Sequence, residues 1–446
     1  MKKQICKYTL VLSLLTAKIS LFGFRYFPTL DDYIQYSAYS LYPKNYVLFT
    51  AGTIYKRPAA AVFDLFVWQK LGMYFSLVLL TFMLFLSAVF LIRALKTVGI
   101  NLSRFFVLFF LFCPLNFEAT YWISAASRIV TSIFFCAVSL YVFAFAKGKF
   151  RIFIFAFFNL LSYLFYEQSL VFSFVTTIVF LCFTNKKFIA VPIINVVLTG
   201  VYYIICAPFD RFADRGEIGI KFLPHILSLC EIFTSVFPKM IFKSPHIWIS
   251  PLIFAVILFI LNKFCPPKNF SGKRSIIYAF AVFLCPFTPY FVLKNSYISL
   301  RACIFAFMAI GIILDNIPFS KRSSNIIFSA LLSLFLISSA SELSQYKAAY
   351  QTDIAICENL INSHLIEDNK TYYLVGAKRV YNQITAPFAE HILNVTQADW
   401  SLTGALRSYS QNKNIKRIIP VSDAAQANEN YEKIYIDNNL KISKSE

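Results

Sequence analysis

Residues 72–92 read GMYFSLVLLTFMLFLSAVFLI, an apolar run without a charged side chain. A helix rises 1.5 Å per residue, so about 20 such residues cross the hydrocarbon core of a bilayer. The rest of the chain has a similar character: of its 446 residues 58% are hydrophobic, 51 are Phe and only 14% are charged, and the mean hydropathy is +0.63. Because this composition is too apolar for a soluble globule, it predicts a polytopic, all-α membrane protein.

Further apolar runs extend this pattern along the chain and predict about eleven transmembrane helices. The predicted spans are residues 5–24, 72–92, 105–117, 129–146, 152–166, 168–183, 188–207, 246–262, 276–293, 298–314 and 324–341. Residues 223–242 are also mostly apolar, but Glu231 lies in their middle, where a spanning helix would bury a carboxylate. We therefore interpret this segment as a helix on the outer surface or a re-entrant helix.

The formal net charge of +20 arises from short basic clusters between the spans. These clusters are Lys2, Lys3 and Lys7; Arg93, Lys96 and Arg104; Lys147, Lys149 and Arg151; Lys186 and Lys187; Lys263, Lys268, Lys273 and Arg274; and Lys321 and Arg322. They occupy alternate connections and contain no Asp or Glu, which predicts a cytoplasmic N-terminus and an external C-terminal tail. Since they form no single basic face, nucleic acid is not an expected partner. The first run lacks a small-residue cleavage site and is expected to be retained.

The composition becomes polar after Ser341, so we expect a transmembrane domain at residues 1–341 and a small external α/β domain at residues 342–446. The expected elements of this second domain are helices at 342–362 and 397–411 and strands at 371–376, 417–421 and 433–436. It contains no phosphate-binding loop, nucleophile elbow or metal-ligand spacing. A lid or spacer is therefore the first interpretation, and acceptor recognition is the alternative. The ten cysteines are isolated, so neither a structural disulfide nor a zinc site is expected.

Two adjacent carboxylates, Asp31 and Asp32, follow the first span at the start of the connection to the second, which we call the first loop (residues 25–71). Ionisable residues at a membrane boundary are costly and often functional, so this pair is the candidate catalytic site. The alternative is a structural role, because an Asp before Tyr33 is a good N-cap for a following helix.

Other polar residues recur at the same outer level of the predicted bundle. Arg57, Arg128 and Arg301 are candidate ligands of an anionic group, with Lys56, Glu118, Trp122 and Glu167 as supporting residues. Each has a plainer reading: interfacial anchoring for Lys56 and Arg57, helix start for Arg128, and the aromatic belt for Trp122. Arg301 could instead pair with Glu118 or Glu167 and hold helices together.

The order of these short motifs resembles one family over about residues 1–315. The motifs are Asp31-Asp32, Tyr55-Lys56-Arg57-Pro58, Phe117-Glu118-Ala119-Thr120-Tyr121-Trp122-Ile123-Ser124 and Leu164-Phe165-Tyr166-Glu167-Gln168-Ser169-Leu170. Together they resemble the GT-C membrane glycosyltransferases, especially the protein O-mannosyltransferase-like and aminoarabinose-transferase-like branch. The resemblance implies a catalytic Asp31 or Asp32, a polyprenyl-phosphate-linked sugar as donor, and donor-phosphate binding by the basic residues. The Asp-Asp pair departs from the usual Asp-Glu, which leaves the sugar and the need for a metal open; a divalent cation, if used, would bind Asp31 or Asp32.

The expected function is transfer of a sugar from a polyprenyl phosphate to a cell-envelope glycan or lipid-linked acceptor. The reaction would occur at the outer face of a bacterial inner membrane, among membrane lipids. A carboxylate can accept the acceptor's proton, and Arg can stabilise the departing phosphate. Two alternatives stay open: an O-antigen polymerase or ligase, which would depend little on the Asp pair, and a lipid-glycan flippase or other transporter, for which internal repeats and midspan charges would be expected.

Overall fold

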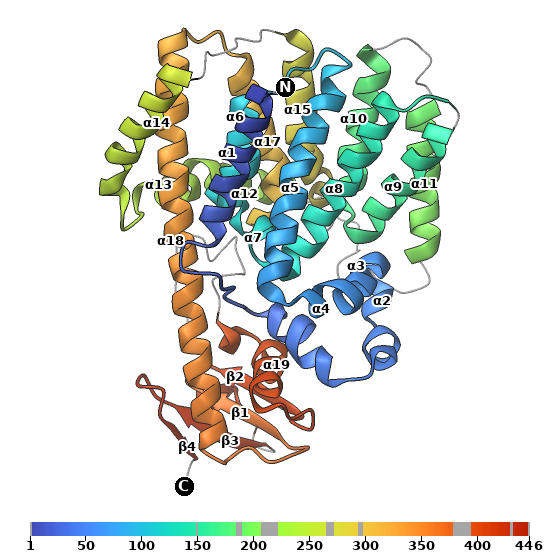
Figure 1. Ribbon diagram of the computed structural model, residues 1–446. Helices are drawn as coiled ribbons and strands as arrows, with labels where there is room; N and C mark the ends of the chain where they lie inside the picture. Colours follow the sequence, from blue (N-terminus) through green and yellow to red (C-terminus); the bar gives the residue numbers. More distant parts are fainter. Residues whose placement is uncertain are drawn as a thin grey trace.

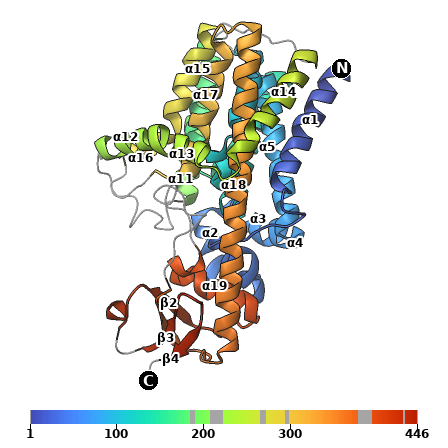
Figure 2. The ribbon, with the colours of Figure 1, turned by 90° about the vertical axis from the view of Figure 1, so that its left-hand side faces the viewer.

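The computed structural model describes residues 2–148, 150–183, 190–206, 222–264, 272–292, 298–377, 394–428 and 431–444. In these residues the protein is mostly helical, with a bundle of helices at one end and a small four-stranded sheet at the other (Figure 1). One helix of 42 residues, α18 (Lys321–Asn362), belongs to both. It begins at the end of the bundle where the N-terminus of the chain lies and ends against the sheet (Figures 1 and 2).

The other helices of the bundle follow the apolar runs of the sequence. They are α1 (Lys2–Ile19), α5 (Met73–Lys96), α6 (Arg104–Val107), α7 (Phe117–Thr120), α8 (Ile123–Phe145), α9 (Phe150–Phe165), α10 (Gln168–Phe183), α11 (Ala190–Cys206), α12 (Phe222–Glu231), α13 (Phe237–Phe242), α14 (Ser250–Phe264), α15 (Lys273–Leu284), α16 (Thr288–Val292) and α17 (Ile304–Asn316). The first loop folds into short helical pieces between bundle and sheet: Tyr33–Ser37, Ala38–Leu41, Tyr46–Thr50, α2 (Thr53–Lys56), α3 (Pro58–Phe63), Asp64–Trp68 and α4 (Gln69–Leu71).

Four helical segments of the described chain are long and apolar enough to cross a membrane: Met73–Lys96, Ile123–Phe145, Phe222–Phe242 and Lys321–Asn362. Shorter apolar helices accompany them, and large side chains such as Phe153 and Phe259 are exposed on their surface. Contiguous exposed apolar surface on helices whose backbone groups are satisfied internally is what a lipid environment requires. The fold therefore supports a multi-pass membrane protein.

Several predicted span boundaries were wrong. Residues 105–117 do not form one helix, because Pro114 forces Cys113 into an extended conformation (ψ 124°) that ends the helix at Phe112. The span predicted at 129–146 begins at Ile123 instead, and the span predicted at 324–341 continues to Asn362. The domain boundary expected after Ser341 thus falls inside a continuous helix.

The segment interpreted as a surface or re-entrant helix does not follow the direction of the bundle. In Figure 2, α12 and α13 run across α18 rather than along it. The segment meets the length and hydropathy of a span, yet little of it is buried inside the protein. Its orientation agrees with the interpretation as a surface or re-entrant helix.

Several of the basic connections, in the residues that the structure describes, meet at one end of the bundle. Arg274 donates to the carbonyl of Val98 at 3.3 Å, and Arg104 donates to Asn325 Oδ1 at 2.7 Å. Asn325 in turn donates to Asn262 at 2.8 Å, which links the end of α14 to the start of α18. The alternation of charge along the sequence therefore corresponds to one face of the folded bundle, opposite the sheet.

The sheet has the strand order β2-β1-β3-β4, with β1 (Thr371–Val375) parallel to β2 (Arg417–Val421) and to β3 (Glu432–Ile436). β4 (Ile442–Lys444) pairs antiparallel with β3. The sheet, α19 (Asp399–Ser410) and the last turns of α18 share one hydrophobic core, and we call this unit the sheet domain. The predicted strands and helices are confirmed; the three-residue β4 was not predicted.

Tyr33, from the first loop, completes the core of the sheet domain. Its side chain is buried among Ile356 and Leu360 of α18, Leu402 of α19 and the strand residues. The two residues before it are Asp31 and Asp32, so the candidate catalytic pair lies where the first loop, the bundle and the sheet domain meet.

The packing of α17 on α6 provides a test of the bundle. A Cβ on Gly311 would lie 2.5 Å from the carbonyl oxygen of Phe105, a backbone atom that cannot yield easily. We expect Gly311→Ala to destabilise the protein by about 1–3 kcal/mol and to lower its apparent Tm in detergent. Gly200→Ala is the matched control, since a Cβ on Gly200 meets nothing within 4 Å; there Ala should stabilise the helix by about 0.5–1 kcal/mol. Equal melting of Gly311→Ala and the unaltered protein would contradict this packing.

Candidate active site

Asp32 is fully buried and accepts four hydrogen bonds. One oxygen receives the Tyr26 hydroxyl at 2.5 Å and the Thr29 N–H at 3.1 Å. The other receives the Ser124 N–H at 3.0 Å and the Ser124 hydroxyl at 2.6 Å. Burial raises the pKa of the Asp32 carboxyl to about 7, and the four donors, which favour the ionised form, oppose that rise. Each oxygen of the Asp32 carboxylate therefore accepts two hydrogen bonds from the protein.

These contacts cap α8. The Ser124 N–H belongs to the first turn of that helix, and the N–H of Ile123 before it donates to the Tyr26 hydroxyl at 2.9 Å. The first N–H groups of a helix have no partner within the helix and carry its positive dipole end, so a carboxylate stabilises this position. The predicted capping role of the Asp pair is thus seen, but for a distant helix. The turn Tyr33–Ser37, which directly follows, has no side-chain cap.

Asp31 lies differently. Its side chain is partly exposed, and its charge acts on Arg128 in α8 and on the Tyr39 phenol in the first loop. The residue before it, Leu30, adopts a positive φ of 42°, a conformation that costs a non-glycine residue on the order of 1 kcal/mol or more. The chain accepts this strain at the point where it turns Asp31 and Asp32 toward different neighbours.

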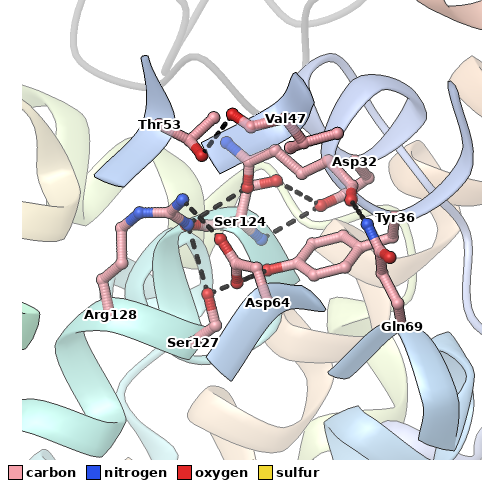
Figure 3. A network of polar contacts seen from close by, with 10 residues as sticks. Asp32, Tyr36, Val47, Thr53, Asp64, Gln69, Ser124, Ser127 and Arg128 are labelled. Carbon is pink, nitrogen blue, oxygen red and sulfur yellow. Dashed lines mark hydrogen bonds and ion pairs between the residues drawn. The ribbon is translucent and has the colours of Figure 1, made fainter. Parts of the chain in front are cut away.

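Arg128 is the centre of a second network (Figure 3). Its guanidinium forms an ion pair with Asp64 at 2.9 Å and donates to Gln35 Oε1 at 3.1 Å, and it also contacts the Ser124 carbonyl. The Tyr36 hydroxyl lies 2.8 Å from Asp64 Oδ1 and 2.9 Å from Ser127 Oγ. Burial raises the pKa of the Asp64 carboxyl, an effect that Arg128 opposes. Arg128 is consequently fixed by protein groups.

The other two candidate arginines also face carboxylates. Arg57 binds Glu167 through two parallel hydrogen bonds, from Nη2 at 2.8 Å and Nε at 3.2 Å, and its guanidinium lies 4.8 Å from the Tyr166 ring centroid. Arg301 pairs with the buried Glu118 at 3.2 Å and lies over the ring of Trp122 at 5.5 Å. Of the partners considered for Arg301 in the sequence analysis, the structure thus shows Glu118.

All of these charged groups belong to one cluster. The Tyr166 phenol interacts electrostatically with Glu167, Arg57, Arg301 and Glu118. Asp64 interacts with both Arg128 and Arg57, which joins the two networks. The structure brings together the ionisable residues that the sequence predicts to converge, which are Asp31, Arg57, Glu118, Arg128, Glu167 and Arg301, and it places Trp122 beside Arg301. The roles of these residues stay predictions. Lys56 ends α2, and its side chain lies outside the described part of the chain.

No protein-family model, curated protein or solved structure matches this chain. Its site must therefore be understood from its own residues.

Sequence reasoning missed Asp64, Tyr36 and Tyr26. Asp64 had a signal, because it is a lone carboxylate within the apolar stretch Ala61-Val62-Phe63-Asp64-Leu65-Phe66. An isolated acid in such a stretch needs a buried partner, which Arg128 supplies. The two tyrosines had no signal that separated them from the many other tyrosines of the first loop.

The cluster does not suit a metal ion at Asp32. Both of its oxygens already accept two hydrogen bonds each from N–H and O–H groups, which a cation would have to displace. Within the described residues, no group of three His, Cys, Asp or Glu side chains is arranged to hold a metal. The option of a cation on Asp32, which the sequence left open, therefore does not fit the donors present.

The difference between the two carboxylates can be measured. Asp32→Asn keeps the shape of the side chain but turns an amide NH2 toward N–H and O–H donors, so a buried hydrogen bond is lost. We expect the free energy of unfolding to fall by about 1.5–3 kcal/mol, with a lower Tm. Asp31→Asn, at a partly exposed position, should change stability by no more than about 0.5 kcal/mol. Equal Tm values for the two variants would refute the capping role of Asp32.

Proposed function

We propose that this protein is a GT-C-like membrane glycosyltransferase that moves a sugar from a polyprenyl phosphate to a cell-envelope glycan or lipid-linked acceptor. The observation that carries the proposal is the position of Asp31, a partly exposed carboxylate beside a cluster that contains Arg128, Arg57 and Arg301. Glycosyl transfer needs such a combination, a base for the acceptor hydroxyl and cations for the departing phosphate.

Asp31 is the proposed general base. A base must be reachable by the acceptor, and Asp31 is partly exposed, whereas Asp32 is fully buried and its oxygens accept from Tyr26, Thr29 and Ser124. Asp32 then acts as a positioning residue, because it fixes the backbone that presents Asp31. The two adjacent carboxylates, equivalent in sequence, thus take separate roles.

Arg57 is the proposed first contact of the donor phosphate. Its ion pair with Glu167 is the most open of the three, with 32% and 46% of the two side chains exposed. A phosphate can replace the carboxylate on the same guanidinium fork. Arg128 is held by Asp64, Gln35 and Ser124 and is better suited to orient the site.

Arg301 is the second phosphate contact in this proposal. It lies over Trp122, whose buried indole N–H has no hydrogen-bond partner among the described residues. A buried donor without a partner calls for an explanation, and an oxygen of the sugar phosphate supplies one. Glu118 would keep Arg301 in place between reaction cycles.

The proposal also sets the side of the membrane. The described basic connections around Arg104 and Arg274 lie at one end of the bundle, and the first loop and the sheet domain lie at the other (Figure 1). By the positive-inside rule the basic end is cytoplasmic, so the reaction takes place on the outer face of a bacterial inner membrane.

The catalytic assignment is tested by sugar transfer in membrane vesicles supplied with radiolabelled glucose, galactose or mannose on undecaprenyl phosphate. We expect Asp31→Asn to lower the rate of label transfer by about 10²- to 10⁴-fold, because the base is lost. Asp423→Asn is the control, since Asp423 is exposed and only caps a short turn. Full activity of Asp31→Asn would overturn the assignment and favour a polymerase- or ligase-type enzyme.

The proposed orientation is tested by labelling single cysteines in intact spheroplasts with an impermeant maleimide. In a background with Cys6, Cys182, Cys206, Cys230 and Cys265 replaced by serine, Ser422→Cys in the sheet domain should react before lysis. Ser323→Cys, exposed at the other end of α18, should react only after lysis. The reverse pattern would place the site in the cytoplasm.

A further inference from the structure

A cavity of about 280 Å³ lies between the first loop and the sheet domain. Residues of the first loop form one wall, and residues of α19 and the start of β2 form the other. The side chains that decide its chemistry are Tyr39, Tyr42, Trp400, Arg407, Lys416 and Arg417. These are three aromatic rings and three cations, and Asp399 is the acidic residue of the lining.

The two walls are held at a fixed distance. A Cβ on Gly404 of α19 would lie 2.4 Å from Cγ1 of Ile34, so only glycine permits this contact. The Tyr42 hydroxyl donates to the Lys413 carbonyl at 3.0 Å across the same junction. A cavity between closely packed elements is preformed and needs little ordering when a ligand binds.

The charges of the cavity are only partly neutralised. Arg417 pairs with Asp399 at 2.5 Å, and Arg407 donates to the carbonyls of Ile415 and Lys416 at 2.8 and 2.9 Å. Lys416 is exposed and makes no ion pair within the described part of the chain. The cavity therefore offers positive charge to a ligand beside its aromatic rings.

We propose that this cavity binds one sugar residue that carries a carboxylate or phosphate group. Aromatic rings offer a flat apolar surface to the C–H face of a pyranose, and Lys and Arg bind the anionic group. Its volume is below the roughly 300–1,000 Å³ of pockets for drug-sized ligands and suits a single residue of a longer glycan. Tyr39, in the wall of the cavity, interacts electrostatically with Asp31. The cavity therefore adjoins the proposed base. That the ligand is part of the acceptor rests on the proposed function; the binding itself does not.

Binding is tested with the full chain in lipid nanodiscs by saturation-transfer NMR. The probes are glucuronate, glucose 6-phosphate, glucose and, by phosphorus NMR, inorganic phosphate. We expect saturable binding of at least one of the acidic sugars, weaker by about tenfold in Trp400→Ala and in Lys416→Gln. Trp248→Ala and Lys413→Gln are matched controls, because Trp248 is 74% exposed on the bundle and Lys413 is exposed outside the lining; both should bind normally.

Three results would overturn the proposal: no saturable binding of either acidic sugar, glucose binding as tightly as the acidic sugars, or inorganic phosphate alone binding as tightly as they do. The last would mark a site for any anion, a lipid headgroup included. Sugar binding that depends on Trp400 and Lys416, without any label transfer by the unaltered protein, would refute the transferase but keep the cavity. Loss of transfer in Asp31→Asn, with sugar binding unchanged in Trp400→Ala and Lys416→Gln, would support the transferase but refute the cavity as the binding site.

Discussion

The buried carboxylate of Asp32 and its four donors form the contact on which the other parts of the site depend. An ionised carboxylate without partners would be very costly at this depth, so the chain around it must supply donors in fixed positions. Tyr26 and Thr29 come from the turn before it, and Ser124 comes from the start of α8. One interaction thus fixes the conformation of the first loop and its attachment to the bundle.

The next residue extends this attachment to the sheet domain. Tyr33 enters the hydrophobic core between α18 and α19, and its hydroxyl donates to Asp353 of α18 at 3.3 Å. Asp353 also accepts the N–H of Val395, which leads into α19. Asp31, Asp32 and Tyr33 therefore direct three successive side chains toward three different parts of the molecule. Asp31 is the least enclosed of the three.

Much of the architecture could be predicted because it depends on local patterns. Apolar runs identified the helices of the bundle, and alternation with β-branched residues identified β1, β2 and β3 almost to the residue.

What could not be predicted depends on contacts between distant residues. Asp32 does not cap the helical turn that directly follows it, as the sequence suggested; it caps α8, which begins some ninety residues later, and no local pattern connects Asp32 with Ser124. In the same way, Asp64 becomes significant only when folding brings Arg128 to it. The sequence left three partners open for Arg301, an anionic ligand, Glu118 or Glu167, and only the fold pairs it with Glu118.

The unbroken course of α18 has a mechanical consequence. At 1.5 Å per residue its 42 residues extend for about 60 Å, most of it packed in the bundle and the last turns in the sheet domain. A stiff helix of this length works as a lever. For an arm of about 30 Å, a tilt of ten degrees within the membrane moves the far end by about 5 Å. Since the close contact of Gly404 with Ile34 joins the sheet domain to the first loop, such a tilt would move both walls of the cavity together and leave its width unchanged.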